Sequence, residues 1–215
     1  EIASCLVGSE MCIRDRNITA DENFDTFSLS WYNNTDVDPA TGLTPYINMQ
    51  KVLKVCHDFV DNFDNTFSNL LFIGQTGVGK TFLSNCIARA LMDSCHSIIY
   101  LTAGEFFDSF KSDDFKEFGS SKFDTSFFVE CDLLIIDDLG TEKASDYNFS
   151  NLFNTINERL LRRKSIIISS NLEMPDIETR YSQRIFSRLV SAYSILRLFG
   201  DDIRCMKKLS PTKRS

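Results

Sequence analysis

Apolar and polar residues alternate along this 215-residue chain in two repeating patterns. Short, mainly apolar runs have the length of buried β-strands. These runs cover residues 70–73, 97–101, 133–138, 165–169 and 194–199. Other segments carry apolar residues three and four positions apart, which is typical of amphipathic helices. These segments cover residues 48–63, 82–92, 103–110, 146–164 and 181–193. The alternation of strands and helices predicts one α/β domain with an appendage.

The first apolar run leads into GQTGVGKT, residues 74–81, which matches the phosphate-binding pattern G-x-x-x-x-G-K-[ST]. Glycines suit this loop because a backbone that wraps a phosphate adopts conformations that a Cβ disfavours. We expect Lys80 to reach the β- and γ-phosphates and Thr81 to offer its hydroxyl to Mg²⁺. A strand before the loop and a helix after it make an ordinary turn a poorer explanation, since the helix N-terminus then points at the phosphates. The predicted nucleotide ligands are Gly74, Gln75, Thr76, Gly77, Val78, Gly79, Lys80, Thr81 and Phe82.

The run at 133–138 ends in two carboxylates, Asp137 and Asp138. A fully apolar strand belongs in the middle of a parallel sheet, and ligands of α/β proteins bind at the carboxyl ends of such strands. We expect Asp137 to hold Mg²⁺, usually through water, and Asp138 to orient the attacking water. The next strand run ends at Asn171, which can reach the γ-phosphate or that water. Taken alone, the acids indicate an acidic turn and Asn171 an ordinary turn residue.

Charge and cysteine content narrow the possible functions. The net charge is −7 and the pI about 4.9, so any contact with DNA would have to be local. Seven cysteines form no C-x-x-C pair and the two histidines lie far apart, which predicts reduced thiols and no metal site built from protein ligands alone. No apolar run approaches the roughly 18 to 20 residues that span a bilayer, so we expect no membrane contact and a cytoplasmic protein.

Five stretches, taken in order, resemble the DnaC/DnaI group of AAA+ ATPases, the bacterial replicative-helicase loaders. They read GQTGVGKTFLSNCIA, DLLIIDDLGTE, SIIISSNL, YSQRIFSRL and GDDIR, and the resemblance spans about residues 46–204. The resemblance implies a three-layer P-loop NTPase of the AAA+ (ASCE) class with a central, five-stranded, mostly parallel sheet. It implies ATP and Mg²⁺ as cofactors. It also implies a protein that assembles on ATP, loads the replicative DNA helicase onto single-stranded DNA, and releases it on hydrolysis.

The same resemblance assigns roles to residues outside the phosphate loop. Asn171 corresponds to the sensor 1 residue, Arg204 to the sensor 2 arginine, and Arg188 to an arginine finger with Arg184 as its neighbour. Such a finger acts on the nucleotide of a neighbouring subunit in an oligomer. The predicted catalytic residues are Lys80, Asp138, Asn171 and Arg188.

Two further points follow from this comparison with the loaders. Ser145 and Tyr147 fall where loaders contact single-stranded DNA. Asp138 stands where most AAA+ proteins have glutamate, and the shorter side chain leaves the water about one methylene further away. We therefore expect slow hydrolysis and a protein closer to an ATP switch.

The sequence divides into four segments of different character. Residues 5–16 back-translate, in one reading frame, to an adaptor used in transposase-based DNA library preparation, so 1–16 are predicted to be non-native; a natural flexible tail is the alternative. Residues 17–48 are polar with scattered aromatics and are interpreted as a linker, left from a truncated N-terminal region, whose aromatics dock on the domain. In loaders that region carries the helicase-binding domain. The ATPase domain is expected at 49–205 and a basic tail at 206–215.

Two other functions fit parts of the pattern. Transposition helper ATPases of the IstB type share much of it, but they contact double-stranded DNA and a transposase. A small-molecule P-loop kinase would need an acceptor pocket and usually an arginine-rich lid. The Asp pair, the Ser-Asn strand end and the arginine-bearing helix, in that order, argue against the kinase.

Overall fold

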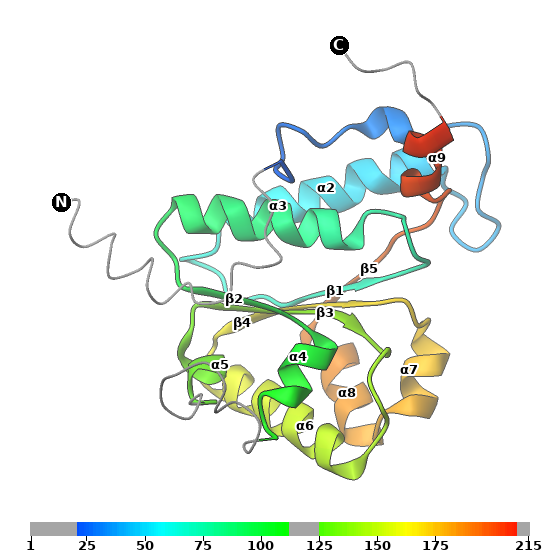
Figure 1. Cartoon of the computed structure of the whole chain (residues 1–215). Coiled ribbons are helices and arrows are strands. Elements are labelled where there is room, and N and C mark those ends of the chain that lie inside the picture. Colours follow the sequence, from blue (N-terminus) through cyan, green and yellow to red (C-terminus); the bar gives the residue numbers. More distant parts are fainter. Residues whose placement is uncertain (1–20, 112–124, 210–215) are drawn as a thin grey trace.

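The computed structural model describes residues 21–111 and 125–209, and the expectations for 1–16 and for the end of the basic tail lie outside these ranges. A five-stranded sheet in the order β2-β3-β4-β1-β5 forms the centre (Figure 1), and all four strand pairs are parallel. The strands are β1 (Leu70–Ile73), β2 (Ile98–Thr102), β3 (Leu133–Leu139), β4 (Ser165–Ser170) and β5 (Ser194–Arg197). The predicted five-stranded α/β fold is confirmed, with a sheet that is wholly rather than mostly parallel.

Helices cover both faces of the sheet (Figure 1). One face carries α2 (Pro45–Asp61) and α3 (Lys80–Asp93), with the short turn η2 (Leu29–Trp31) and α9 (Ile203–Leu209) beside them. The other face carries α4 (Ala103–Asp108), α5 (Phe127–Glu130), α6 (Asp146–Leu161), α7 (Met174–Arg180) and α8 (Gln183–Ala192). None of the described helices has both the length and the apolar character needed to cross a bilayer.

The strand β3 shows why this chain buries a sheet on both faces. Its first four residues are apolar and fully buried, and they alternate between the two sides. Leu134 and Ile136 pack in the cluster under α6 and α8, whereas Leu133 and Ile135 pack in the cluster under α2 and α3. Successive side chains of a strand point to opposite faces, so a run with no polar interruption needs helices on both.

Helix α9 departs from the predicted tail, whereas the segment before α2 docks on the domain as predicted. α9 extends to Leu209, so residues 206–209 of the predicted basic tail are helical. The aromatic residues of segment 21–44 pack on the cluster under α2 and α3. Tyr32 is buried there and donates its hydroxyl hydrogen to the Val78 carbonyl oxygen (3.1 Å).

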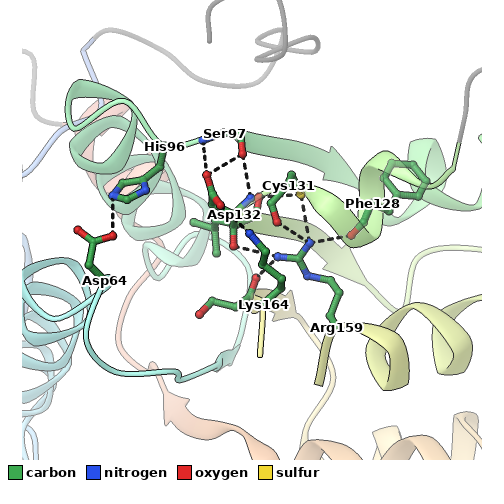
Figure 2. A network of polar contacts seen from close by, with 10 residues as sticks. Asp64, His96, Ser97, Phe128, Cys131, Asp132, Arg159 and Lys164 are labelled. Carbon is green, nitrogen blue, oxygen red and sulfur yellow. Dashed lines mark hydrogen bonds and ion pairs between the residues drawn. The ribbon is translucent and has the colours of Figure 1, made fainter. Parts of the chain in front are cut away.

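A buried arginine ties together the end of the sheet opposite the phosphate loop (Figure 2). Arg159, on α6, has no exposed surface. Its two terminal nitrogens donate to the carbonyl oxygens of Phe128 (2.7 Å), Cys131 (3.0 Å), Asp132 (3.0 Å) and Ser165 (2.6 Å). These carbonyls belong to α5 and to the amino ends of β3 and β4, so one guanidinium joins three elements. We call this set the Arg159 cluster.

Candidate nucleotide-binding site

The loop between β1 and α3 wraps tightly, and its glycines allow other segments to approach its backbone closely. Gly77 and Gly79 have φ values of +82° and +105°, a region that favours glycine. A Cβ on Gly77 would collide with the Asp202 carboxylate, and one on Gly79 would lie 2.6 Å from the Tyr32 hydroxyl. Gly79 is also the N-cap of α3 and gives that helix no side-chain cap. The backbone N–H groups of the first turn therefore suit an anionic ligand such as a phosphate.

Lys80 is the buried cation of this loop, with 5% of its surface exposed. Its Nζ donates to the carbonyl oxygens of Gly74 (2.6 Å) and Gln75 (2.8 Å) and to Oδ1 of Asn171 (2.6 Å). Burial lowers the pKa of Lys80, while the neighbouring acids act in the opposite direction. The structure thus brings the loop lysine and the end of β4 into direct contact.

Asp137 and Thr81 form the part of the site that suits a metal ion. The Thr81 hydroxyl donates to Oδ2 of Asp137 (3.0 Å), as does the Tyr100 hydroxyl (3.0 Å). Ser169 donates to the other carboxylate oxygen. A carboxylate beside a threonine hydroxyl offers the oxygen ligands that Mg²⁺ prefers, so these two residues are the ones that could hold it.

Asp138 leaves the regular ladder of the sheet. The pairing of β3 with β4 shifts register between Ile136 and Leu139, and Asp138 has a φ of +57°, which is uncommon for any residue except glycine. Its N–H donates to Oγ of Ser169 (3.0 Å), and its Oδ1 accepts from Nδ2 of Asn171 (3.3 Å). The carboxylate therefore lines the cavity instead of pairing within the sheet.

Burial raises the pKa of Asp138, the charge of Asp137 raises it further, and Lys80 and Arg204 oppose this shift. A carboxylate with a raised pKa accepts a proton more readily than an ordinary aspartate. Such a group can orient a water molecule and take its proton.

A cavity of about 180 Å³ is lined by Lys80, Asp138 and Asn171. The cavity is also lined by Phe27, Trp31 and Phe82 and by Arg204 and Lys207 of α9. The Lys207 ammonium lies 5.8 Å from the ring centroids of both Trp31 and Phe82. Aromatic rings can stack on a nucleotide base, and the cations beside them can bind its phosphates.

Sequence reasoning placed Arg204 at the site but missed Phe27, Trp31 and Lys207. It assigned the two aromatics to a linker and the lysine to the tail. No local pattern marks them, because the cavity joins two segments about 170 residues apart. The docking of the linker aromatics on the domain was predicted and is confirmed, but their place at the cavity was not.

The cavity is not lined by the other residues to which the resemblance gives a role, Arg184, Arg188, Ser145 and Tyr147. Arg188 is half-buried on α8, where its Nη2 donates to Oδ1 of Asn157 (3.3 Å) and its guanidinium lies 5.6 Å from the Phe153 ring centroid. Arg184 is exposed on the same helix. A position away from the cavity of its own chain is what an arginine finger that acts on a neighbouring subunit requires.

Ser145 and Tyr147 lie together at the start of α6. Ser145 is the N-cap of that helix, and its hydroxyl oxygen accepts from the Asn148 N–H (3.1 Å). Tyr147 is 53% exposed and donates its hydroxyl hydrogen to the Phe110 carbonyl oxygen (2.8 Å). Ser145 therefore has a structural role in any case, and contact with DNA stays a prediction for both residues.

Comparison with known proteins finds relatives in both sequence and structure. The family model described as IstB-like ATP binding protein matches residues 44–210. The replicative helicase loader DnaC of Escherichia coli (strain K12) is 23% identical over 151 residues, which cover 70% of this chain and 61% of DnaC. The chain thus spans about three-fifths of the length of that relative.

Two solved structures share the fold. A DnaC helicase loader superposes with a TM-score of 0.68 at 21% identity, covering 86% of this chain and 99% of that chain. DnaI superposes with a TM-score of 0.63 at 21% identity, covering 89% and 94%. The resemblance to the DnaC/DnaI group is confirmed, and these structures show the AAA+ fold.

Proposed function

Because the chain belongs to the family of IstB-like ATP-binding proteins, we propose that it is an Mg²⁺-dependent ATPase that loads the replicative DNA helicase onto single-stranded DNA. One observation carries the ATPase part. The ends of three neighbouring strands bring Lys80, Asp137, Asp138 and Asn171 into one set of direct or shared contacts beside a cavity. A purely structural cluster has no need for a cavity next to it.

Each residue has one task in this proposal. Lys80 and the backbone N–H groups of the loop bind the phosphates of ATP, and Arg204 binds them from α9. Thr81 and Asp137 hold Mg²⁺, which neutralises charge on the phosphate oxygens. Asp138, oriented by Asn171, positions the attacking water and accepts its proton.

Assembly of several copies of the chain supplies the last catalytic group. Arg188 is partly exposed and away from its own cavity, so it serves the nucleotide of a neighbouring copy. A finger that acts in this way can raise the rate by about 10³ to 10⁵. ATP then favours the oligomer, and hydrolysis releases it.

Relatives support the helicase-loading part of the proposal. The relative DnaC is named as a replicative helicase loader. Helicase binding is assigned to an N-terminal domain, and single-stranded DNA to the surface at Ser145 and Tyr147. The family description favours a second candidate, a transposition helper of the IstB type.

Titration calorimetry with ATP and Mg²⁺ tests the nucleotide site. Wild-type protein binds, whereas Lys80→Ala loses detectable binding because the phosphates lose their buried cation. Lys51→Ala, at an exposed position on α2, is the matched control and keeps the wild-type affinity. A Lys80→Ala protein that binds ATP with unchanged affinity would disprove the assignment of the phosphate loop.

The full-length gene product separates the two cellular roles. A loader captures the replicative helicase of its own organism and transfers it to a circular single strand when ATP is present. A transposition helper captures a transposase and duplex DNA instead. Capture of the transposase without the helicase would replace loading by the second candidate.

A further inference from the structure

A buried carboxylate lies between the turn after Asp138 and the helix that carries Arg188. The side chain of Glu142 is only 3% exposed. Its Oε2 accepts from the N–H of Gly140 (2.8 Å), and its Oε1 accepts from the Tyr181 hydroxyl (2.6 Å). Arg180 pairs with the same carboxylate (Nε to Oε1 3.4 Å) and also donates to the Glu142 carbonyl oxygen. We call this set the Glu142 clamp.

One side of the clamp is the turn that follows Asp138. Gly140 is two residues beyond Asp138 and has a φ of +111°. The carbonyl oxygen of the intervening Leu139 accepts from Oγ of Ser170 (2.5 Å). The backbone here is held on one side by β4 and on the other by Glu142. A shift of Glu142 therefore moves the peptide groups next to Asp138.

The other side of the clamp is the start of α8. Arg180 ends α7, Tyr181 follows it, and Ser182 is the N-cap of α8. Tyr181 is buried and its ring packs edge-on against Phe149, with centroids 5.3 Å apart. A buried carboxylate that loses a partner is costly. The clamp therefore resists opening, and α8 and the turn move together.

We infer that Glu142 is a positioning residue that couples the placement of α8 to the placement of Asp138. When Arg188 and Arg184 meet a second copy of this chain, the position of α8 is fixed. Tyr181 and Arg180 then fix Glu142, and Glu142 fixes the turn beside Asp138. The inference rests on the proposed ATPase function. It adds that the effect of assembly on the nucleotide site is carried by this carboxylate.

Coupling of this kind is reciprocal, which makes it measurable. If assembly changes ATP affinity by some factor, ATP changes the assembly constant by the same factor, commonly about 5- to 150-fold. Substitution of a side chain that only stabilises the fold would change the melting temperature and leave this coupling factor unchanged. The factor is therefore the quantity to measure, and the intrinsic ATP affinity of dilute monomer is the reference.

Two variants weaken the clamp with little change of shape. Glu142→Gln keeps the volume, but its amide nitrogen cannot accept from either Gly140 or Tyr181, so one link is lost. Tyr181→Phe keeps the ring against Phe149 and removes only the hydroxyl. The matched control is Glu178→Gln, a carboxylate exposed on α7.

The experiment measures the assembly constant by analytical ultracentrifugation with and without a non-hydrolysable ATP analogue. Wild type and Glu178→Gln show the full ATP-dependent shift. Glu142→Gln and Tyr181→Phe show a shift of less than about threefold, well below the usual range of coupling, and dilute monomers of all four bind the analogue alike. If Glu142→Gln does not fold, Tyr181→Phe carries the test.

The outcomes separate this inference from the proposed function. Wild-type protein that fails to bind ATP overturns the ATPase assignment, and with it the clamp's role. Wild-type protein that binds ATP and assembles on it, together with clamp variants that keep the full shift, overturns the inference alone. Wild-type protein that binds ATP without any change in assembly also overturns the inference.

Discussion

Two buried cations occupy opposite ends of the same sheet and have opposite surroundings. Arg159, at the amino ends of β3 and β4, donates to four backbone carbonyl oxygens that the strands and α5 fix in place (Figure 2). Lys80, near the carboxyl ends, donates to two loop carbonyls and to the side chain of Asn171, beside a cavity. Burial lowers the pKa of both groups.

The two ends of the sheet differ in whether the buried cation borders a cavity that a ligand could enter. The partners of Arg159 are four backbone carbonyls and the buried Cys131 sulfur, all in packed elements, so its bonds stabilise the fold. Lys80 and its partner Asn171 line the cavity, and close by, Asp138 has a strained backbone and a raised pKa. Strain and unfavourable charge are typical of functional sites, where stability is sacrificed for chemistry. Mutations at the two ends should therefore change stability in opposite directions.

The largest expected effect is at Arg159. Arg159→Met keeps most of the apolar stem but leaves four carbonyl oxygens, three of them in buried bonds, without their donor. The free energy of unfolding should therefore fall by roughly 3 to 5 kcal/mol. Urea unfolding measures it. Arg162→Met, at an exposed ion pair with Glu158 (3.7 Å), is the control and should change stability by less than about 0.5 kcal/mol. A loss below 1 kcal/mol for Arg159→Met, the order of one net hydrogen bond, would remove the contrast between the two ends.

A smaller effect of opposite sign is expected at Asp138. Asp138→Asn removes a charge that lies beside Asp137, and asparagine tolerates the positive φ. The free energy of unfolding should rise, by at most about 1 kcal/mol because solvent in the cavity screens the repulsion.

The same substitution should lower ATP hydrolysis by about 10² or more, since the group that accepts the proton is lost. Chemical denaturation and a phosphate-release assay on the same samples measure both. Asp176→Asn, exposed on α7, should change neither. A destabilised Asp138→Asn protein would show that the carboxylate supports the fold and is not held there at a cost.

Sequence reasoning predicted the carboxyl end of the sheet better than the amino end. The contact between Thr81 and Asp137 could be expected, because the phosphate loop and the Asp pair both follow apolar strands and parallel strands end at one edge. Strand β3 could equally be predicted from its uninterrupted apolar run. These features depend on local pattern and on the rule of parallel packing alone.

Other features depend on tertiary packing and left no local pattern. Arg159 occupies the last turn of an amphipathic helix, where a basic residue normally indicates a solvent-exposed face. The positive φ of Asp138 arises from the register shift between β3 and β4. Trp31 and Lys207 meet only because α9 folds back beside segment 21–44. Contacts across such distances in sequence cannot be read from periodicity.

The smallest expected effect is a difference in how the two ends respond to acid. Asp132, part of the network beside Arg159, accepts hydrogen bonds from Lys164 (2.7 Å) and from the N–H (3.0 Å) and hydroxyl (2.7 Å) of Ser97. Burial alone would raise the pKa of Asp132, but these donors outweigh it and lower the pKa to about 2.

A carboxyl group whose pKa is lower in the folded state adds stability above its unfolded pKa, and that stability is lost as the pH falls through the folded value. The advantage of wild type over Asp132→Asn should therefore be constant near neutral pH and should shrink as the pH falls from about 4 to about 2.

For Asp138, whose pKa is raised, the sign of the pH dependence is reversed. Asp138→Asn should be more stable than wild type at neutral pH, and this stability difference should disappear as the pH falls through the raised pKa of Asp138. It should disappear at a higher pH than that at which the stability difference between wild type and Asp132→Asn begins to shrink. Urea unfolding of the three proteins between pH 2.5 and 7 measures both differences. A stability difference for Asp132→Asn that does not depend on pH would mean that its hydrogen bonds, rather than its charge, stabilise the amino end.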